Sequence, residues 1–145
     1  MTEIIKGLYL GNRDTPVCDQ NYSLIINCTP DLPLHPEECR QIRIPVWDRP
    51  ESAQYTVMQN CLPTVVRAID DALQRQQKVL VYCAAGQSRS PTVIACYLLW
   101  INRDWTADQS IKSVKDRDSN AFFGGVTFQK VIEWAVMHFN VTLIK

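Results

Sequence analysis

A cysteine and an arginine with five small or polar residues between them stand in the middle of the chain, at Cys83 and Arg89. A cysteine thiolate is a strong nucleophile, and a guanidinium presents a planar set of N–H donors that suits the oxygens of a phosphate. A loop of this length can curl round a tetrahedral oxyanion, with the nucleophile below the anion and the arginine beside it. The spacing therefore indicates an anion-binding loop, called the 83–89 loop below, that carries its own nucleophile.

The residues on either side of the 83–89 loop predict a strand before it and a helix after it. Residues 79–82 are apolar or aromatic and uncharged, which is typical of a short buried strand. In the pair Ser90-Pro91, serine suits a helix N-cap and proline the first helical position. The N–H groups and the dipole of a helix N-terminus attract an anion and favour a thiolate over a thiol.

Residues 81–90 (Val-Tyr-Cys-Ala-Ala-Gly-Gln-Ser-Arg-Ser) resemble the signature of the cysteine-dependent protein tyrosine phosphatases, above all the small dual-specificity branch. One position departs from the signature, because that family nearly always has histidine where this chain has Tyr82. The resemblance implies hydrolysis of phosphotyrosine, phosphoserine and phosphothreonine in proteins through a cysteinyl-phosphate intermediate, with no cofactor and no metal. It also implies that residues 1–145 are one dual-specificity phosphatase catalytic domain.

The resemblance assigns roles to individual residues. Cys83 is the expected nucleophile, Arg89 the expected phosphate clamp, and the Ser90 hydroxyl is expected to ease departure of the thiolate in the second step. The expected substrate-binding residues are Ala84, Ala85, Gly86, Gln87, Ser88 and Arg89.

A phosphate ester also needs a proton for its leaving oxygen, which a carboxylic acid on a nearby loop can supply. Asp48 lies between an expected strand and Pro50, and its place upstream of the signature matches the general acid/base of the family. An aspartate before a proline also commonly caps a turn, so the two interpretations compete on the residues alone. Asp31 is the alternative acid.

Two further residues raise hypotheses about reactivity. Cys28 ends an expected buried strand, where a small apolar core role is commonest for cysteine; the alternative is a reversible disulfide with Cys83, as in some relatives. Tyr82 is neutral near pH 7 and carries its donor farther from the backbone than a histidine does. We expect it to leave Cys83 less activated, and turnover slower, than a histidine would.

The remaining patterns predict the fold. Expected strands are residues 4–11 with a bend at Gly7, 22–28 and 41–46, and expected helices are residues 55–77, 91–103, a helix from Thr106, and 126–139. Pro45 places the 41–46 strand near an edge, and Pro63 should break the first helix into a short turn up to Asn60 and a new start. The sequence predicts a single-domain α/β fold, with a twisted central sheet of four to five strands and helices on both faces.

Composition limits the classes of partner. The 145 residues suffice for one domain, and 15 basic residues balance 15 acidic ones, which argues against nucleic-acid and membrane partners. No apolar run approaches the roughly 20 residues of a membrane span, and the start resembles no signal peptide. Six cysteines without paired spacing indicate a reduced chain, so we expect a cytoplasmic location with nuclear access.

A second function remains open. A phosphatase-like binding module with weak or no turnover would grip phosphorylated partners through the same loop, and Tyr82 is the feature that favours it. The variable residues of the loop carry no cation, which argues against highly charged substrates such as phospholipids or RNA ends. The physiological substrate and the oligomeric state stay open.

Overall fold

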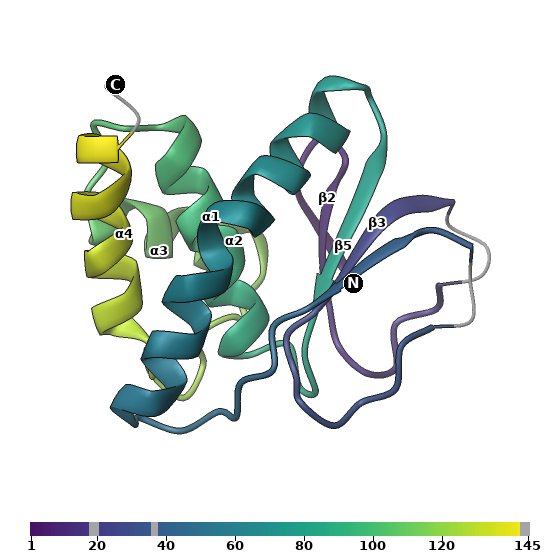
Figure 1. Ribbon diagram of the computed structural model, residues 1–145, viewed down its shortest axis with the longest axis horizontal. Helices are drawn as coiled ribbons and strands as arrows, with labels where there is room; N and C mark the ends of the chain where they lie inside the picture. Colours follow the sequence, from purple (N-terminus) through teal and green to yellow (C-terminus); the bar gives the residue numbers. More distant parts are fainter. Residues whose placement is uncertain (18–20, 36–37, 143–145) are drawn as a thin grey trace.

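The central strand of the sheet is β5 (Lys78–Tyr82), in which every residue after Lys78 is buried. A strand covered on both faces needs apolar side chains at successive positions, and Val79, Leu80 and Val81 supply them. β2 (Leu8–Gly11) and β3 (Tyr22–Asn27) pair with β5 in parallel, one on each side. The computed structural model describes residues 1–17, 21–35 and 38–142 (Figure 1).

Two shorter strands form the edges of the sheet. β1 (Thr2–Ile5) pairs antiparallel with β2 across a turn at Gly7, whose φ of +88° favours glycine, and β4 (Arg40–Arg43) pairs in parallel with β3. The strand order is β1-β2-β5-β3-β4, and β4 takes the edge position that Pro45 predicts. Because four strands are parallel, their carboxyl ends share one edge, where α/β proteins bind ligands.

The described helices all lie on one face of the sheet (Figure 1). They are α1 (Ser52–Gln74), α2 (Arg89–Ile101), α3 (Ala107–Arg117) and α4 (Gln129–Thr142). The single-domain α/β fold and the strand number are confirmed, but the expectation of helices on both faces is wrong for the described residues. The other face, which includes Leu80 and Tyr82, is covered by loop residues such as Val17 and Leu32. An apolar helix stripe shows that a helix packs on a sheet, but does not show on which face.

α1 corrects the expected break at Pro63. The helix runs without interruption from Ser52 to Gln74 with Pro63 inside it. Proline removes one helical hydrogen bond at a cost of about 3 kcal/mol. Met58, Leu62 and Val65 are buried on either side of Pro63, so packing against the sheet outweighs this local cost.

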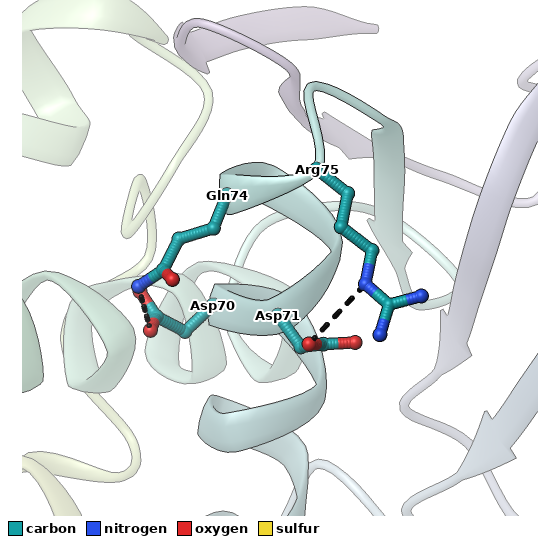
Figure 2. Close-up of polar contacts among 4 residues, drawn as sticks. All are labelled: Asp70, Asp71, Gln74 and Arg75. Atoms are coloured by element: carbon teal, nitrogen blue, oxygen red, sulfur yellow. Dashed lines mark hydrogen bonds and ion pairs between the residues drawn. The ribbon is translucent and has the colours of Figure 1, made fainter.

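Polar pairs lie near the C-terminal end of α1 (Figure 2). Gln74 Nε2 donates to Asp70 Oδ2 at 2.7 Å, and Arg75 forms an ion pair with Asp71 at 3.4 Å. Both partners of the ion pair are largely exposed, so it contributes at most about 0.5 kcal/mol. Asp70 does more, because its other oxygen accepts from the Tyr97 hydroxyl at 3.0 Å and thereby joins α1 to α2. Burial, and then this bond, raise the pKa of Tyr97.

The last two helices begin and end close to where the sequence predicts. The expected capping box at the start of α3 is present: Thr106 Oγ1 accepts from the Gln109 N–H, and the Gln109 side chain accepts from the Thr106 N–H. Within the described ranges, no helix has the length and hydropathy needed to cross a bilayer.

Candidate active site

Cys83 directly follows β5 and is 2% exposed. Its Sγ lies 3.1 Å from Ser90 Oγ, and the Ser90 N–H donates to it at 3.5 Å. Hydrogen bonds from α2 to the sulfur stabilise a negative charge there. The structure therefore brings the expected nucleophile and the expected helper hydroxyl together.

α2 begins two residues earlier than the Ser-Pro pair predicts. Ser88 is the N-cap, and its carbonyl accepts from both the N–H and the hydroxyl of Thr92. The expectation that Ser90 caps this helix is therefore wrong. Pro91 fits within the first turn because N–H groups there have no partner inside a helix, so its missing hydrogen costs nothing. The Ser90 hydroxyl is left to face Cys83.

Three carbonyl groups of the 83–89 loop are tied to other parts of the chain. The bonds run to Ala84 O from Arg13 N at 3.1 Å and Arg13 Nε at 3.5 Å, to Ala85 O from Asn120 Nδ2 at 3.2 Å, and to Gln87 O from Phe122 N at 2.7 Å. Since a peptide group is planar and trans, a carbonyl held outward turns the following N–H to the opposite side. Within the described chain, the N–H groups of residues 84–88 make no hydrogen bond, so they are free to bind an oxyanion.

Gly86 lets the loop turn against the end of β2. Its φ is +70°, a conformation that side chains rarely adopt. A Cβ at this position would lie 3.0 Å from the carbonyl oxygen of Gly11. Glycine is therefore required both for the backbone conformation and for the close approach.

Arg89 joins the 83–89 loop to the segment after β4. It is 8% exposed, and its Nη1 donates to Val46 O at 2.9 Å. Its Nε, like the buried Ser88 Oγ, has no partner among the described residues. A buried donor left unpaired costs about 1–3 kcal/mol, and a phosphate oxygen would satisfy it. Arg89 is thus placed to hold both an anion and a neighbouring loop.

Asp48 stands two residues after Val46, in the loop that Arg89 holds. It is exposed, and the loop is closed by turns in which Arg49 N donates to Trp47 O. The alternative acid, Asp31, is also exposed, but its loop is tied to Asn27 and Arg43 instead. The hydrogen bonds thus connect Asp48, more directly than Asp31, to the 83–89 loop.

Cys28 lies next to Cys83 across two paired strands. β3 and β5 pair in parallel at Asn27 and Tyr82, and the Cys28 N–H donates to Tyr82 O at 2.8 Å. Both cysteines belong to the core on the helix side of the sheet. Burial, and then the negative charge of Cys83, raise the pKa of Cys28 well above its ordinary value.

Tyr82 points to the opposite side of the sheet from Cys83. Its ring packs edge-on against His35 with centroids 5.3 Å apart, and both line a cavity with Arg13 and Leu34. Burial raises the pKa of Tyr82, so the phenol stays neutral near pH 7. His35, which carries no motif in the sequence, is therefore a neighbour of the residue before the nucleophile.

Sequence reasoning missed the residues that tie the 83–89 loop. Arg13, Asn120 and Phe122 lie far from the loop in sequence, and a side-chain amide or a backbone N–H that reaches a distant carbonyl leaves no pattern. The Gly124-Gly125 pair does predict a turn after them, and the φ of +109° at Gly125 agrees with it. No group of three or more metal-ligating side chains lies together in the residues that the structure describes.

The chain is similar in sequence to known proteins. The profile of the family described as "Dual specificity phosphatase, catalytic domain" matches residues 8–135. The chain is 32% identical over 124 residues to the putative tyrosine phosphatase 123R of Invertebrate iridescent virus 6, covering 83% of this chain and 82% of that protein. It is 35% identical over 125 residues to dual specificity protein phosphatase Mpk3 of Drosophila melanogaster, which covers 79% of this chain but 29% of the fly protein.

Solved structures share the fold. A mouse putative dual specificity phosphatase, crystallised with zinc tungstate, superposes with a TM-score of 0.81 at 22% identity and covers 99% of this chain and 90% of its own. Human DUSP28 superposes with a TM-score of 0.76 at 19% identity and covers 99% and 98%.

Proposed function

The chain belongs to the dual specificity phosphatase catalytic-domain family, and from this membership we propose that residues 1–145 form a catalytic domain that hydrolyses phosphotyrosine, phosphoserine and phosphothreonine in proteins. The observation that carries the proposal is the 83–89 loop: the N–H groups of residues 84–88 have no partner in the described chain, and the cysteine accepts from the N–H of Ser90 at the start of α2. Hydrolysis of three phosphopeptides that differ in the phosphorylated residue tests it. We expect phosphate release from all three, and release from none would contradict the proposal.

In the proposed first step, the Cys83 thiolate attacks phosphorus in line and the bond from phosphorus to the leaving oxygen breaks. Asp48, as a carboxylic acid, gives its proton to that oxygen. The N–H groups of the loop and the Arg89 guanidinium hold the three equatorial oxygens, where charge spreads in the transition state. The product is a cysteinyl-phosphate and a free hydroxyl side chain.

In the second step, Asp48 as a carboxylate takes a proton from water, and the resulting oxygen attacks phosphorus. The sulfur–phosphorus bond breaks and Cys83 leaves as a thiolate. The Ser90 hydroxyl, 3.1 Å from Sγ, donates to the departing sulfur and lowers the cost of its charge. Inorganic phosphate then leaves the site.

Replacing Asp48 with asparagine is expected to reduce kcat for a phosphoserine peptide by about 10²-fold or more, because the leaving alkoxide loses its proton donor. The loss should be smaller with p-nitrophenyl phosphate, whose leaving group is a weaker base. Steady-state kinetics of Asp48→Asn and Asp31→Asn with both substrates measure this. If Asp31→Asn shows the selective loss and Asp48→Asn does not, the acid is Asp31.

Replacing Tyr82 with histidine is expected to make Cys83 react with iodoacetamide at lower pH and to increase turnover. Tyr82 faces away from Cys83 and stays neutral, whereas a histidine can donate to the loop from a shorter side chain. Rates of thiol alkylation between pH 5 and 9, in wild type and Tyr82→His, check this. Tyr9→His is a matched control, because Tyr9 packs against the same face of the sheet. Identical pH profiles for wild type and Tyr82→His would contradict the prediction.

We also propose that Cys28 protects Cys83 during oxidation. Peroxide oxidises the Cys83 thiolate to a sulfenic acid and is reduced to water; the Cys28 thiolate then attacks that sulfur, and hydroxide leaves to form a disulfide. The adjacent strand positions of the two cysteines support this pairing.

The disulfide should form faster as pH rises. Because the pKa of Cys28 is raised, its thiolate fraction is small at pH 7 and grows about tenfold per pH unit below that pKa. Mass mapping after peroxide treatment at pH 7 and 8.5, in wild type and in Cys96→Ser as a buried-cysteine control, measures the linked peptide. Oxidised Cys83 that is never linked to Cys28 rules the pairing out.

The state of the cysteines also favours a reducing compartment. Four cysteines of the described chain are free thiols: Cys28, Cys61, Cys83 and Cys96. Free thiols are typical of the cytoplasm and nucleus, which is where we place the proposed activity, with phosphorylated proteins as its partners.

A further inference from the structure

Few large apolar side chains are exposed in the described part of the chain, and they are not spread evenly. They are Met1, Leu34, Trp47, Ile101, Phe123 and Met137. Leu34, Trp47 and Phe123 are 47%, 41% and 77% exposed, and they come from three separate loops. Trp47 follows β4, and Leu34 lines a cavity with Tyr82 at the end of β5, so both lie near the sheet edge where β5 delivers Cys83.

Hydrogen bonds connect two of these three loops to the 83–89 loop. Trp47 follows Val46, whose carbonyl accepts from Arg89 at 2.9 Å. Phe123 follows Phe122, whose N–H donates to Gln87 O at 2.7 Å. Trp47 and Phe123, which are more than seventy residues apart in sequence, therefore both lie next to residues that are bonded to the 83–89 loop.

Leu34 lies near Tyr82, on the face of the sheet opposite the described helices. It lines one cavity with Tyr82 and Arg13, and Arg13 donates to Ala84 O through both its backbone and its side chain. The three exposed apolar residues thus lie next to the three segments that contact the 83–89 loop at Ala84, Gln87 and Arg89.

The backbone holds Phe123 outward. Phe122 is 3% exposed and has a φ of +59°, and a turn closes behind it as Gly125 N donates to Phe122 O at 3.0 Å. A positive φ is unfavourable for a phenylalanine, so the packing of Phe122 imposes this turn. One phenylalanine of the pair is anchored in the core and its neighbour is presented to solvent.

Trp47 is also held in place. The Arg49 guanidinium lies 5.3 Å from the centre of its ring, and the Trp47 N–H donates to Gln54 Oε1 at 2.9 Å. The charged side chains of the same loops have both signs, as in Arg13 beside Asp14 and Asp48 beside Arg49. Since these charges oppose one another, apolar area is the feature that a substrate can exploit here.

We propose that Leu34, Trp47 and Phe123 form an apolar rim that binds apolar side chains flanking the phosphorylated residue of a protein segment. The proposal rests on the proposed function only in that the 83–89 loop must bind the phosphoryl group. The substrates it selects are phosphorylated segments with leucine-like or aromatic residues beside the phosphorylated position. Each such contact removes apolar surface from water on both sides, which favours a partner with apolar side chains.

Two phosphotyrosine peptides test the rim, one with leucine and one with serine at the two positions on each side of the phosphotyrosine. Their dissociation constants are measured with the Cys83→Ser protein, which cannot turn them over, and kcat/KM is measured with wild type. We expect the leucine peptide to be preferred about tenfold in both measurements. This preference should fall at least about threefold in Phe123→Ser and in Leu34→Ser, and stay unchanged in Met137→Ser, a 68% exposed control on α4.

The ratio between peptides cancels any general loss of activity in a variant, and the binding measurement does not depend on catalysis. Equal affinity for the two peptides, or a preference that survives in both rim variants, overturns the rim; so does binding of neither peptide. A leucine preference in binding without any turnover by wild type keeps the rim and rejects the proposed function. Turnover without a preference keeps the function and rejects the rim.

Discussion

Replacing Cys83 with serine is expected to lower hydrolysis of p-nitrophenyl phosphate by at least about 10⁴-fold. A serine hydroxyl is almost entirely protonated near pH 7 and is a far weaker nucleophile than a thiolate. Serine and cysteine side chains have similar size. The Ser90 hydroxyl already lies 3.1 Å from Cys83 Sγ and can form a hydrogen bond with the new hydroxyl. Because the loop ties use backbone carbonyls and not the sulfur, phosphate binding should persist.

The measurement is steady-state kinetics together with phosphopeptide affinity in the same protein. Cys61→Ser is the matched control, since this half-buried thiol lies on α1, and it should retain wild-type activity. Cys83→Ser activity above a tenth of wild type would remove the covalent mechanism. A wild type that binds phosphopeptides but shows no more turnover than Cys83→Ser would establish the binding module instead.

Replacing Arg89 with lysine is expected to reduce kcat/KM by about 10²–10³-fold. Lysine keeps the positive charge but lacks the planar fork, so it cannot hold two phosphate oxygens while donating to Val46 O. The loop that carries Asp48 loses its tie to the 83–89 loop in the same change. The loss should therefore be greater for a phosphoserine peptide, which needs the proton donor, than for p-nitrophenyl phosphate.

Arg117→Lys is the matched control for this prediction. Arg117 also donates from its guanidinium to a backbone carbonyl, Ile4 O at 3.0 Å, but it does so from α3 to β1. Kinetics and thermal unfolding of both variants distinguish a loss of catalysis from a loss of stability. If the two variants lose activity alike, or Arg89→Lys loses it equally with both substrates, Arg89 does not hold the acid loop.

The chemistry of this chain could be predicted from a short stretch because its parts are contiguous. The strand, the 83–89 loop and the start of α2 lie within residues 78–92, and local patterns suffice to recognise each. The role of Asp48 could be predicted only from its position in a loop and from its place upstream of Cys83 in the sequence. The Arg89 bond to Val46 O now gives a physical reason for that placement.

Other features depend on packing that local patterns do not carry. Pro63 breaks an isolated helix, but buried residues on both sides of it keep α1 continuous. In the sequence, Ser90 resembles a helix N-cap because it precedes Pro91. In the structure its hydroxyl instead contacts the sulfur of Cys83. The ties from Arg13 and Asn120 join positions 71 and 35 residues from their acceptors, so only the folded chain brings them together.

These ties have a consequence for the order in which the protein is made. A ribosome synthesises Cys83 before it synthesises Asn120 and Phe122, the donors to Ala85 O and Gln87 O. A nascent chain thus contains the nucleophile while two of the three carbonyl contacts that shape its loop are still missing. The anion site is completed late in translation, so a truncated product that ends before Asn120 should be a poor phosphatase even when its central strands have paired.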